Sequence, residues 1–246
     1  PHEIGPNSPL EALKAQAVIA RTWAIYNSNR FKADKFHLCV TTQCQVYKPK
    51  ITSENIEKAI LDTQNKILVF EGKPINAFYH ASNGGISASS GESWKIDDYP
   101  YFANQFDFID SEKKYSYPSN KKREDLKYFL QSDENIFFGN NHYLFRWKRK
   151  VSDKEIKKLL QKLEFISNDS EILDLKVMRR GVSGRVLKLQ INHNKPTKKI
   201  ILVKDDIRKS LNFLPSNLFI IDKLNDNFWI FTGGGFGHGV GLSQSG

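Results

Sequence analysis

Residues 8–29 read SPLEALKAQAVIARTWAIYNSN, and this stretch sets the first clear element of the fold, a helix. Its opening, from Ser8 to Glu11, is typical of a helix start, with a capping serine, a proline in the first turn and a glutamate that completes a capping box. Small and aliphatic side chains then recur at helical spacing and predict a narrow face for close packing: Leu13, Ala17, Ala20 and Ala24. We therefore expect a helix over residues 9–29.

Beyond this helix the signals change from helix to strand along the chain. We expect further helices at residues 53–63, capped by Ser53, at 123–131, and at 153–164 behind a second capping box from Ser152 to Glu155. We expect strands at residues 67–70, 75–80, 172–179, 185–192, 199–203, 218–222 and 228–231, the first two as a hairpin, and a loop at 82–98.

This order of elements, helices early and antiparallel strands late, predicts an α+β fold with a mainly antiparallel sheet and a small helical lobe. No convincing linker interrupts the chain, so we expect a single domain over residues 1–246. Residues from about 111 to 170 are the candidate for an inserted helical lobe. The start at Pro1 and the end at Gly246, inside a glycine-rich motif, lead us to expect a fragment truncated at both ends.

The composition is globular and basic. Hydrophobic residues make up 39% of the chain and the formal charge is +10, which excludes a disordered chain and favours acidic partners. Residues 121–123 and 146–150 are basic runs, and the tryptophan within the second could stack on nucleic-acid bases or belong to a lysine-rich strand edge. No nucleic-acid fold signature accompanies these runs, so we favour the strand edge and expect no nucleic-acid partner. No apolar window approaches the length of a membrane span.

Residues 233–244, GGGFGHGVGLSQ, are the densest motif of the chain. Glycine at this density lets the backbone turn sharply and approach a ligand closely. The spacing fits neither a P-loop nor a dinucleotide fingerprint, and no nucleophile elbow surrounds Ser243. From these residues alone, we expect a glycine-rich turn.

Three motifs in order along the chain together resemble the stage II sporulation protein D and amidase-enhancer family. They are EALKAQAVIARTWA at 11–24, FYHASNGG at 78–85 with Trp94 after it, and GFGHGVGLSQ at 235–244. The resemblance spans nearly the whole chain, with residues 44–47 and 101–110 also in the expected order. It implies an extracytoplasmic lytic transglycosylase that cleaves peptidoglycan between N-acetylmuramic acid and N-acetylglucosamine and leaves a 1,6-anhydro end.

The resemblance also implies which residues do this chemistry, in a cleft beside the N-terminal helix. One carboxyl group suffices as acid and base because the 6-hydroxyl of the sugar is the nucleophile. The matching position is Glu3, eight residues before the EALK element, whereas the rival Glu11 is explained as a helix cap that stays ionised. We expect Glu3 and His238 in one cleft, and we expect catalysis to require no cofactor.

The family positions implied to bind substrate are Lys14, Arg21, His80, Tyr101, Asp110, His238 and Ser243. Lys14 and Arg21 lie on one stripe of the helix, and an arginine fork suits the lactyl carboxylate of muramic acid. The structural alternatives are a solvated face for these two cations, a core tyrosine, a turn aspartate and a structural histidine at a strand end. The implied partners are glycan strands, stripped of stem peptides, and, in the alternative non-catalytic role, a cell-wall amidase.

The two cysteines leave three alternatives open: a structural zinc site, a disulfide or two unpaired thiols. Cys39 and Cys44, with His37 just upstream, could hold a structural zinc with a further ligand from His142, His193 or water. In an oxidising compartment the same cysteines would instead form a disulfide.

Overall fold

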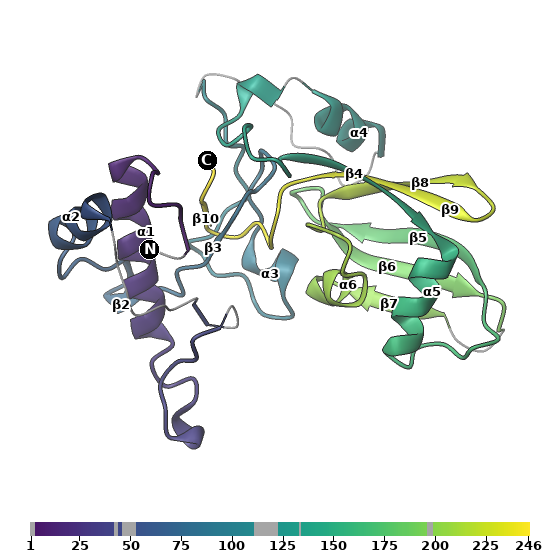
Figure 1. Cartoon of the computed structure of the whole chain (residues 1–246), viewed down its shortest axis with the longest axis horizontal. Coiled ribbons are helices and arrows are strands. Elements are labelled where there is room, and N and C mark those ends of the chain that lie inside the picture. Colours follow the sequence, from purple (N-terminus) through teal and green to yellow (C-terminus); the bar gives the residue numbers. More distant parts are fainter. Residues whose placement is uncertain (1–2, 42–43, 46–52, 111–122, 133, 196–198) are drawn as a thin grey trace. The chain divides into compact units, whose positions relative to one another are not determined.

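The computed structural model of the chain describes residues 3–41, 44–45, 53–110, 123–132, 134–195 and 199–246. It divides into two compact units, Pro1–Tyr79 and His80–Gly246, and each is described by itself (Figure 1). Helices and antiparallel sheets are both present, which confirms the α+β class. The prediction of one domain with an inserted lobe stays a prediction, and residues 46–47, 111–120 and the first two lysines of the run 121–123 lie outside the described residues.

The first unit is built on two packed helices. These are α1 (Leu10–Tyr26) and α2 (Glu54–Asp62), which lie side by side in Figure 1 and bury Leu13 against Ile56 and Ala59. The remaining elements are the 3-10 helix η1 (Lys32–Asp34) and the hairpin strands β1 (Val69–Phe70) and β2 (Lys73–Pro74). A hairpin is therefore present at the expected turn, but its second strand is Lys73–Pro74 and not the expected residues 75–80. Within 75–80 only Tyr79 and His80 form a strand, and that strand does not pair with β1.

The start of α1 differs from the prediction. Pro9 is the capping residue and no side chain caps the helix. The backbone N–H of Ser8 donates instead to the carbonyl of Gly5 at 3.1 Å, so this serine belongs to a preceding turn. Glu11 pairs with Lys14 rather than closing a capping box. At the other end the backbone and the side chain of Asn27 both donate to the carbonyl of Trp23, and the helix ends three residues before the expected Asn29.

The second unit contains two antiparallel three-stranded sheets. One has the order β4-β9-β8 and the other β5-β6-β7. The strands are β4 (Arg146–Ser152), β5 (Ile172–Arg180), β6 (Val186–His193), β7 (Ile200–Val203), β8 (Phe219–Asn225) and β9 (Phe228–Gly234). A hydrophobic core joins side chains of both sheets, among them Leu189, Ile191 and Phe231. The predicted strands of this unit are thus confirmed, with shifted ends.

Helices and short segments complete the second unit. They are α3 (Ser90–Ser93), α4 (Arg123–Gln131), η2 (Glu134–Ile136), α5 (Asp153–Lys162), α6 (Asp205–Ser210) and β10 (Leu242–Ser243). The capping box of α5 is present as predicted, with both Ser152–Glu155 contacts made. Two short helices were missed: α3 interrupts the expected loop at 82–98, and α6 follows β7. The strand β3 (Tyr79–His80) spans the boundary of the units, and its carbonyl at His80 accepts from the backbone of Gln244 beside β10.

The basic run at residues 146–150 is strand β4, an edge of its sheet among the described strands. Trp147 is buried, and its indole N–H donates to the carbonyl of Gly235 at 3.0 Å. The following residues, Lys148 to Lys150, are exposed. The strand-edge interpretation is therefore correct, and this tryptophan is not available for base stacking.

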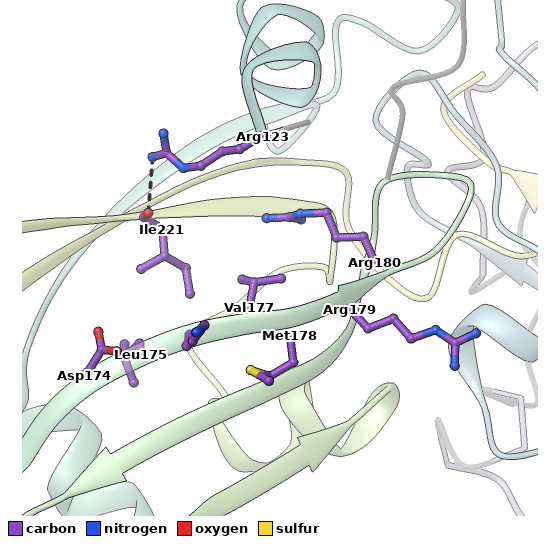
Figure 2. Close-up of a pocket in the computed structure, with 9 residues that line it drawn as sticks. Arg123, Asp174, Leu175, Val177, Met178, Arg179, Arg180 and Ile221 are labelled. Carbon is purple, nitrogen blue, oxygen red and sulfur yellow. Dashed lines mark hydrogen bonds between the residues drawn. The ribbon is translucent and has the colours of Figure 1, made fainter. Parts of the chain in front are cut away.

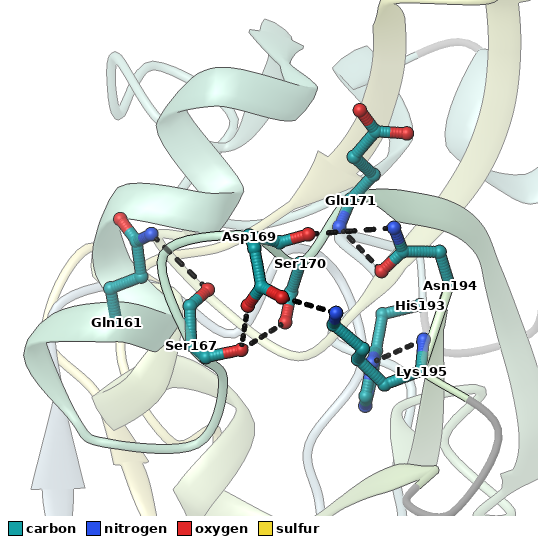
Figure 3. A network of polar contacts seen from close by, with 8 residues as sticks. All are labelled: Gln161, Ser167, Asp169, Ser170, Glu171, His193, Asn194 and Lys195. Atoms are coloured by element: carbon teal, nitrogen blue, oxygen red, sulfur yellow. Dashed lines mark hydrogen bonds and ion pairs between the residues drawn. The ribbon is translucent and has the colours of Figure 1, made fainter.

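A polar network closes one end of the β5-β6-β7 sheet (Figure 3). Asp169 forms an ion pair with Lys195 and accepts from Ser167, and Asn194 Oδ1 accepts from the backbone of Glu171 at 3.0 Å. These contacts hold the pKa of Asp169 at about 2, chiefly through the hydrogen bond from Lys195. The network ties the loop before β5 to the turn after β6.

Candidate functional site

Glu3 is partly buried in the loop before α1, where its carboxylate accepts a hydrogen bond from the phenol of Tyr79. Burial, followed by the negative charge of Glu3 and this bond, raises the pKa of Tyr79 above its ordinary value. The phenol therefore stays protonated at neutral pH and can donate to the Glu3 carboxylate. Sequence reasoning did not single out Tyr79, although it stands beside His80 in the motif at 78–85.

Lys14 lies between two carboxylates on α1 and α2. Its Nζ is 2.9 Å from Glu11 Oε1 and 3.2 Å from Asp62 Oδ2, and hydrogen bonds to these partners raise the pKa of Lys14. All three residues line an open cavity of about 440 Å³. Glu11 itself is highly exposed, with 83% of its side-chain surface accessible.

Arg21 contacts the end of α2. Its Nη1 donates to the carbonyls of Thr63 and Lys66, both at 2.7 Å. The guanidinium thus ties α1 to the turn that follows α2, in which the backbone N–H of Lys66 also donates to the carbonyl of Thr63. This contact is structural, and the predicted role of Arg21 in substrate binding stays a prediction.

In the second unit, the glycine-rich motif brings two predicted residues together. The ring of His238 lies 5.4 Å from that of His80 and 4.7 Å from that of Trp94, measured between centroids. The Nδ1 of His238 accepts from the backbone N–H of Val240, and its carbonyl accepts from Ser93 Oγ at 2.8 Å. These bonds fix the His238 ring within an aromatic cluster.

His80 has the environment of a neutral, structural histidine. It is buried, and its Nδ1 lies 3.1 Å from the carbonyl oxygen of Val240. Burial, together with the positive charges of Arg185 and Arg208, lowers the pKa of His80 to about 3. The neutral ring then donates from Nδ1 to Val240.

Arg185 is a buried tether that sequence reasoning missed. Only 2% of its surface is accessible, and its guanidinium donates to the carbonyls of Asn83 and Ile86 at 2.9 and 3.0 Å. It packs so closely against Gly239, whose φ is +82°, that a Cβ there would lie 2.2 Å from Arg185 Nη2. Two other glycines of this motif pack against the motif at 78–85: a Cβ at Gly235 would lie 2.7 Å from the carbonyl oxygen of Ser82, and one at Gly237 would lie 2.9 Å from His80 Cβ.

Tyr101 and Ser243, also predicted, line one cavity of about 290 Å³ in this unit. Ser243 Oγ accepts from the backbone N–H of Asn83 at 3.3 Å, and the ring of Tyr101 stacks on Tyr99 at 5.2 Å. Asp107 lines the cavity as well and accepts from Asn83 Nδ2 at 2.8 Å. The predicted Asp110 is exposed and is not among the lining residues. Stacked tyrosines beside hydroxyl, amide and carboxylate groups suit a sugar ring with its hydroxyls.

The cysteines are joined in the structure as a Cys39–Cys44 disulfide, with their Cα atoms 5.6 Å apart. His37 Nδ1 lies 2.7 Å from the carbonyl oxygen of Ser28. Within the part of the chain that the structure describes, no group of three or more histidine, cysteine and acidic side chains is placed to hold a metal ion. A zinc ion at this place would need both thiols reduced.

Glu3 belongs to the first unit and His238 to the second. The expectation that these two residues share a cleft therefore stays a prediction. No helix among the described residues has the length and apolarity needed to span a membrane.

Comparison with known proteins places the two parts of the chain in two families. A profile of the stage II sporulation protein matches residues 1–70, and a profile of a domain of unknown function, DUF8618, matches residues 88–241. An uncharacterized protein of Brachyspira hyodysenteriae is 28% identical over 253 residues, and the amidase enhancer of Bacillus subtilis is 26% identical over 262 residues. Both alignments cover 100% of this chain, which spans 57% and 36% of the length of these two relatives. The stage II sporulation protein D of Bacillus amyloliquefaciens is 34% identical over 100 residues, covering 34% of this chain and 29% of that protein.

Proposed function

The chain belongs to the stage II sporulation protein D and amidase-enhancer family and, over residues 88–241, to the family of the domain DUF8618, and on this premise we propose that it is a peptidoglycan lytic transglycosylase. The proposed substrates are extracytoplasmic glycan strands stripped of their stem peptides. Cleavage falls between N-acetylmuramic acid and N-acetylglucosamine and leaves a 1,6-anhydro end. The proposed reaction needs no cofactor.

One observation carries the proposal: Glu3, in the unit that the stage II sporulation profile matches, is partly buried and held by the phenol of Tyr79. In the proposed reaction the Glu3 carboxyl group donates its proton to the bridging oxygen as the bond from that oxygen to C1 of muramic acid breaks. The resulting carboxylate takes the proton of the 6-hydroxyl as this oxygen bonds to C1. The proton is thereby returned to Glu3, and no second carboxylate is needed.

Tyr79 is the proposed positioning residue for Glu3. Its phenol donates to the carboxylate and so restricts the direction in which the carboxyl group can point. Lys14 contributes less charge to the site than an isolated cation would, because Glu11 and Asp62 both contact it. The stacked Tyr99 and Tyr101, with Ser243 in the same cavity as Tyr101, supply the proposed sugar-binding surface of the second unit.

Digestion of purified, peptide-stripped glycan strands, with products identified by mass spectrometry, tests the proposal. We expect anhydromuramic products from the wild type, a loss of at least about a hundredfold in Glu3→Gln and a smaller loss in Tyr79→Phe. Glu11→Gln is the matched control, with the same change in the same unit, and should digest normally. If Glu3→Gln digests normally while Glu11→Gln is inactive, the acid has been assigned to the wrong glutamate.

A second candidate function is non-catalytic: binding of glycan strands to activate a cell-wall amidase. It is favoured by the similarity to the amidase enhancer, which covers 100% of this chain, whereas the similarity to stage II sporulation protein D covers 34%. Co-sedimentation with cell walls, faster release of stem peptides by an added amidase and no anhydro sugars would support this function over the first.

A further inference from the structure

A groove of about 420 Å³ in the second unit lies between two strand edges, away from the residues assigned above (Figure 2). One side is β5 and the other is β8, and each is an outer strand of its three-stranded sheet among the described strands. Partly buried aliphatic side chains, Val177 from β5 and Ile221 from β8, line it. Two outer strands that face one groove present backbone groups that no neighbouring strand pairs.

The edge of β8 is covered by arginine side chains. Arg180 Nη1 donates to the carbonyl of Phe219 at 2.7 Å, and Arg123 Nη2 donates to the carbonyl of Ile221 at 3.3 Å. Phe219 and Ile221 are two residues apart, so their carbonyls point to the same side of the strand. Figure 2 shows both arginines reaching toward β8, while Arg179 points away from them. Strand addition at β8 is thereby blocked, and β5 remains as the edge that can accept a strand.

Positive charge exceeds negative charge along this groove. Arg123 pairs with Asp222, but the hydrogen bonds of Arg180 go to the neutral carbonyls of Gly184 and Phe219. Burial and the nearby charge of Arg123 lower the pKa of Arg180 to about 10, which leaves it charged at neutral pH. Lys176 is exposed on the same groove, and Asp174 is the acidic residue among the lining residues.

We propose that this groove binds an extended acidic peptide segment of a partner protein, which adds a strand to the edge of β5. Its backbone would pair with β5, and its carboxylates would meet Arg123, Lys176 and Arg180. Its alternate apolar side chains would contact Val177 and Ile221. A strand edge combined with an aliphatic surface favours a peptide over a phosphate polymer, which has no backbone amide to pair and no apolar side chain to bury.

Fluorescence anisotropy with a short labelled peptide that alternates glutamate and valine tests this proposal on the whole chain. We expect saturable binding, weakened roughly tenfold by the double substitution Arg123→Gln and Lys176→Gln, since both side chains are exposed and charged. The matched control is Lys148→Gln with Arg149→Gln, the same charge change on the exposed positions of β4. Equal weakening by both pairs would overturn the proposal, because the effect would then reflect net charge alone.

Three further probes separate strand addition from anion binding. A peptide with lysine in place of glutamate should not bind, and one with alternate backbone amides methylated should bind at least about tenfold more weakly. Inorganic polyphosphate should fail to displace the glutamate–valine peptide at about 0.15 M salt, where surface charges are screened. Full binding of the methylated peptide, or displacement by polyphosphate, would show a site for anions in general and would overturn the proposal.

Discussion

Replacing Gly239 by alanine should destabilise the second unit by far more than backbone strain alone. Its φ of +82° is a left-handed conformation, which costs an alanine about 1–2 kcal/mol. The added Cβ would also lie 2.2 Å from Nη2, 2.5 Å from Cζ and 2.6 Å from Nε of Arg185. This guanidinium is buried and bonded to two carbonyls, so it cannot move aside without breaking them. Losing one such bond and leaving its partner buried adds about 1–3 kcal/mol. The expected total is therefore about 2–5 kcal/mol.

Gly184→Ala is the matched control in the same unit. Its φ is +80°, and the nearest atom to the new Cβ is a methyl carbon of the buried Leu126 at 3.0 Å, a contact that a shift of a few tenths of an ångström relieves. This variant should therefore lose little more than the cost of strain. Urea denaturation, followed by hydrogen exchange of peptides from β6, reports on the second unit separately from the first. Equal stability of the two variants would refute the assignment of Arg185 as a fixed tether.

The remaining predictions concern stability. Because the folded pKa of His80 is about 3 and the unfolded value about 6.5, the unfolded state takes up a proton that the folded state does not. Stability of the second unit should accordingly fall as pH drops from about 6.5 toward 3, and His80→Gln should flatten this dependence in acid denaturation; an unchanged slope would contradict it. Reduction of the Cys39–Cys44 disulfide should lower the stability of the first unit by about 2 kcal/mol, the entropy of a short closed loop, with the bond checked by intact mass under non-reducing conditions. Ser152→Ala should cost about 1 kcal/mol in urea denaturation through loss of the cap of α5, and a cost near zero would argue against the capping box.

Local signals accounted for most of the secondary structure. The Ser152–Glu155 capping box and the helix at 123–131 appear as predicted, because caps and apolar periodicity act over a single turn. The capping signal failed at Ser8, because the backbone N–H of this serine donates to Gly5 in a turn before the helix. Periodicity did not reveal α3 and α6, because these helices are too short to show a repeating pattern.

The candidate site also has a part that the sequence could predict and a part that it could not. The motifs at 78–85 and 235–244 could be selected from the sequence, and His80 does meet His238 across them. The residues that hold them together could not be selected: Arg185 looks like any basic residue in the sequence, and only burial makes it a tether. Asp107 and Asp110 are likewise indistinguishable by type, yet Asp107 lines a cavity and Asp110 is exposed.

The sequence by itself determined the α+β class, the main helices and strands, the edge strand at 146–150 and the family motifs, because periodicity, capping and motif spacing are local properties of the chain. Tertiary structure decided which residues contact one another. Tyr79 donates to Glu3, Arg185 packs against Gly239, and Arg123 and Arg180 donate to carbonyls at the edge of β8. The hydrogen bond from Arg180 to β8 joins residues 39 positions apart in the sequence, and the one from Arg123 joins residues 98 positions apart. Whether a charged side chain becomes a ligand, a tether or a solvated group depends on the burial and the neighbours that the folded chain gives it, and a single residue's type does not specify these.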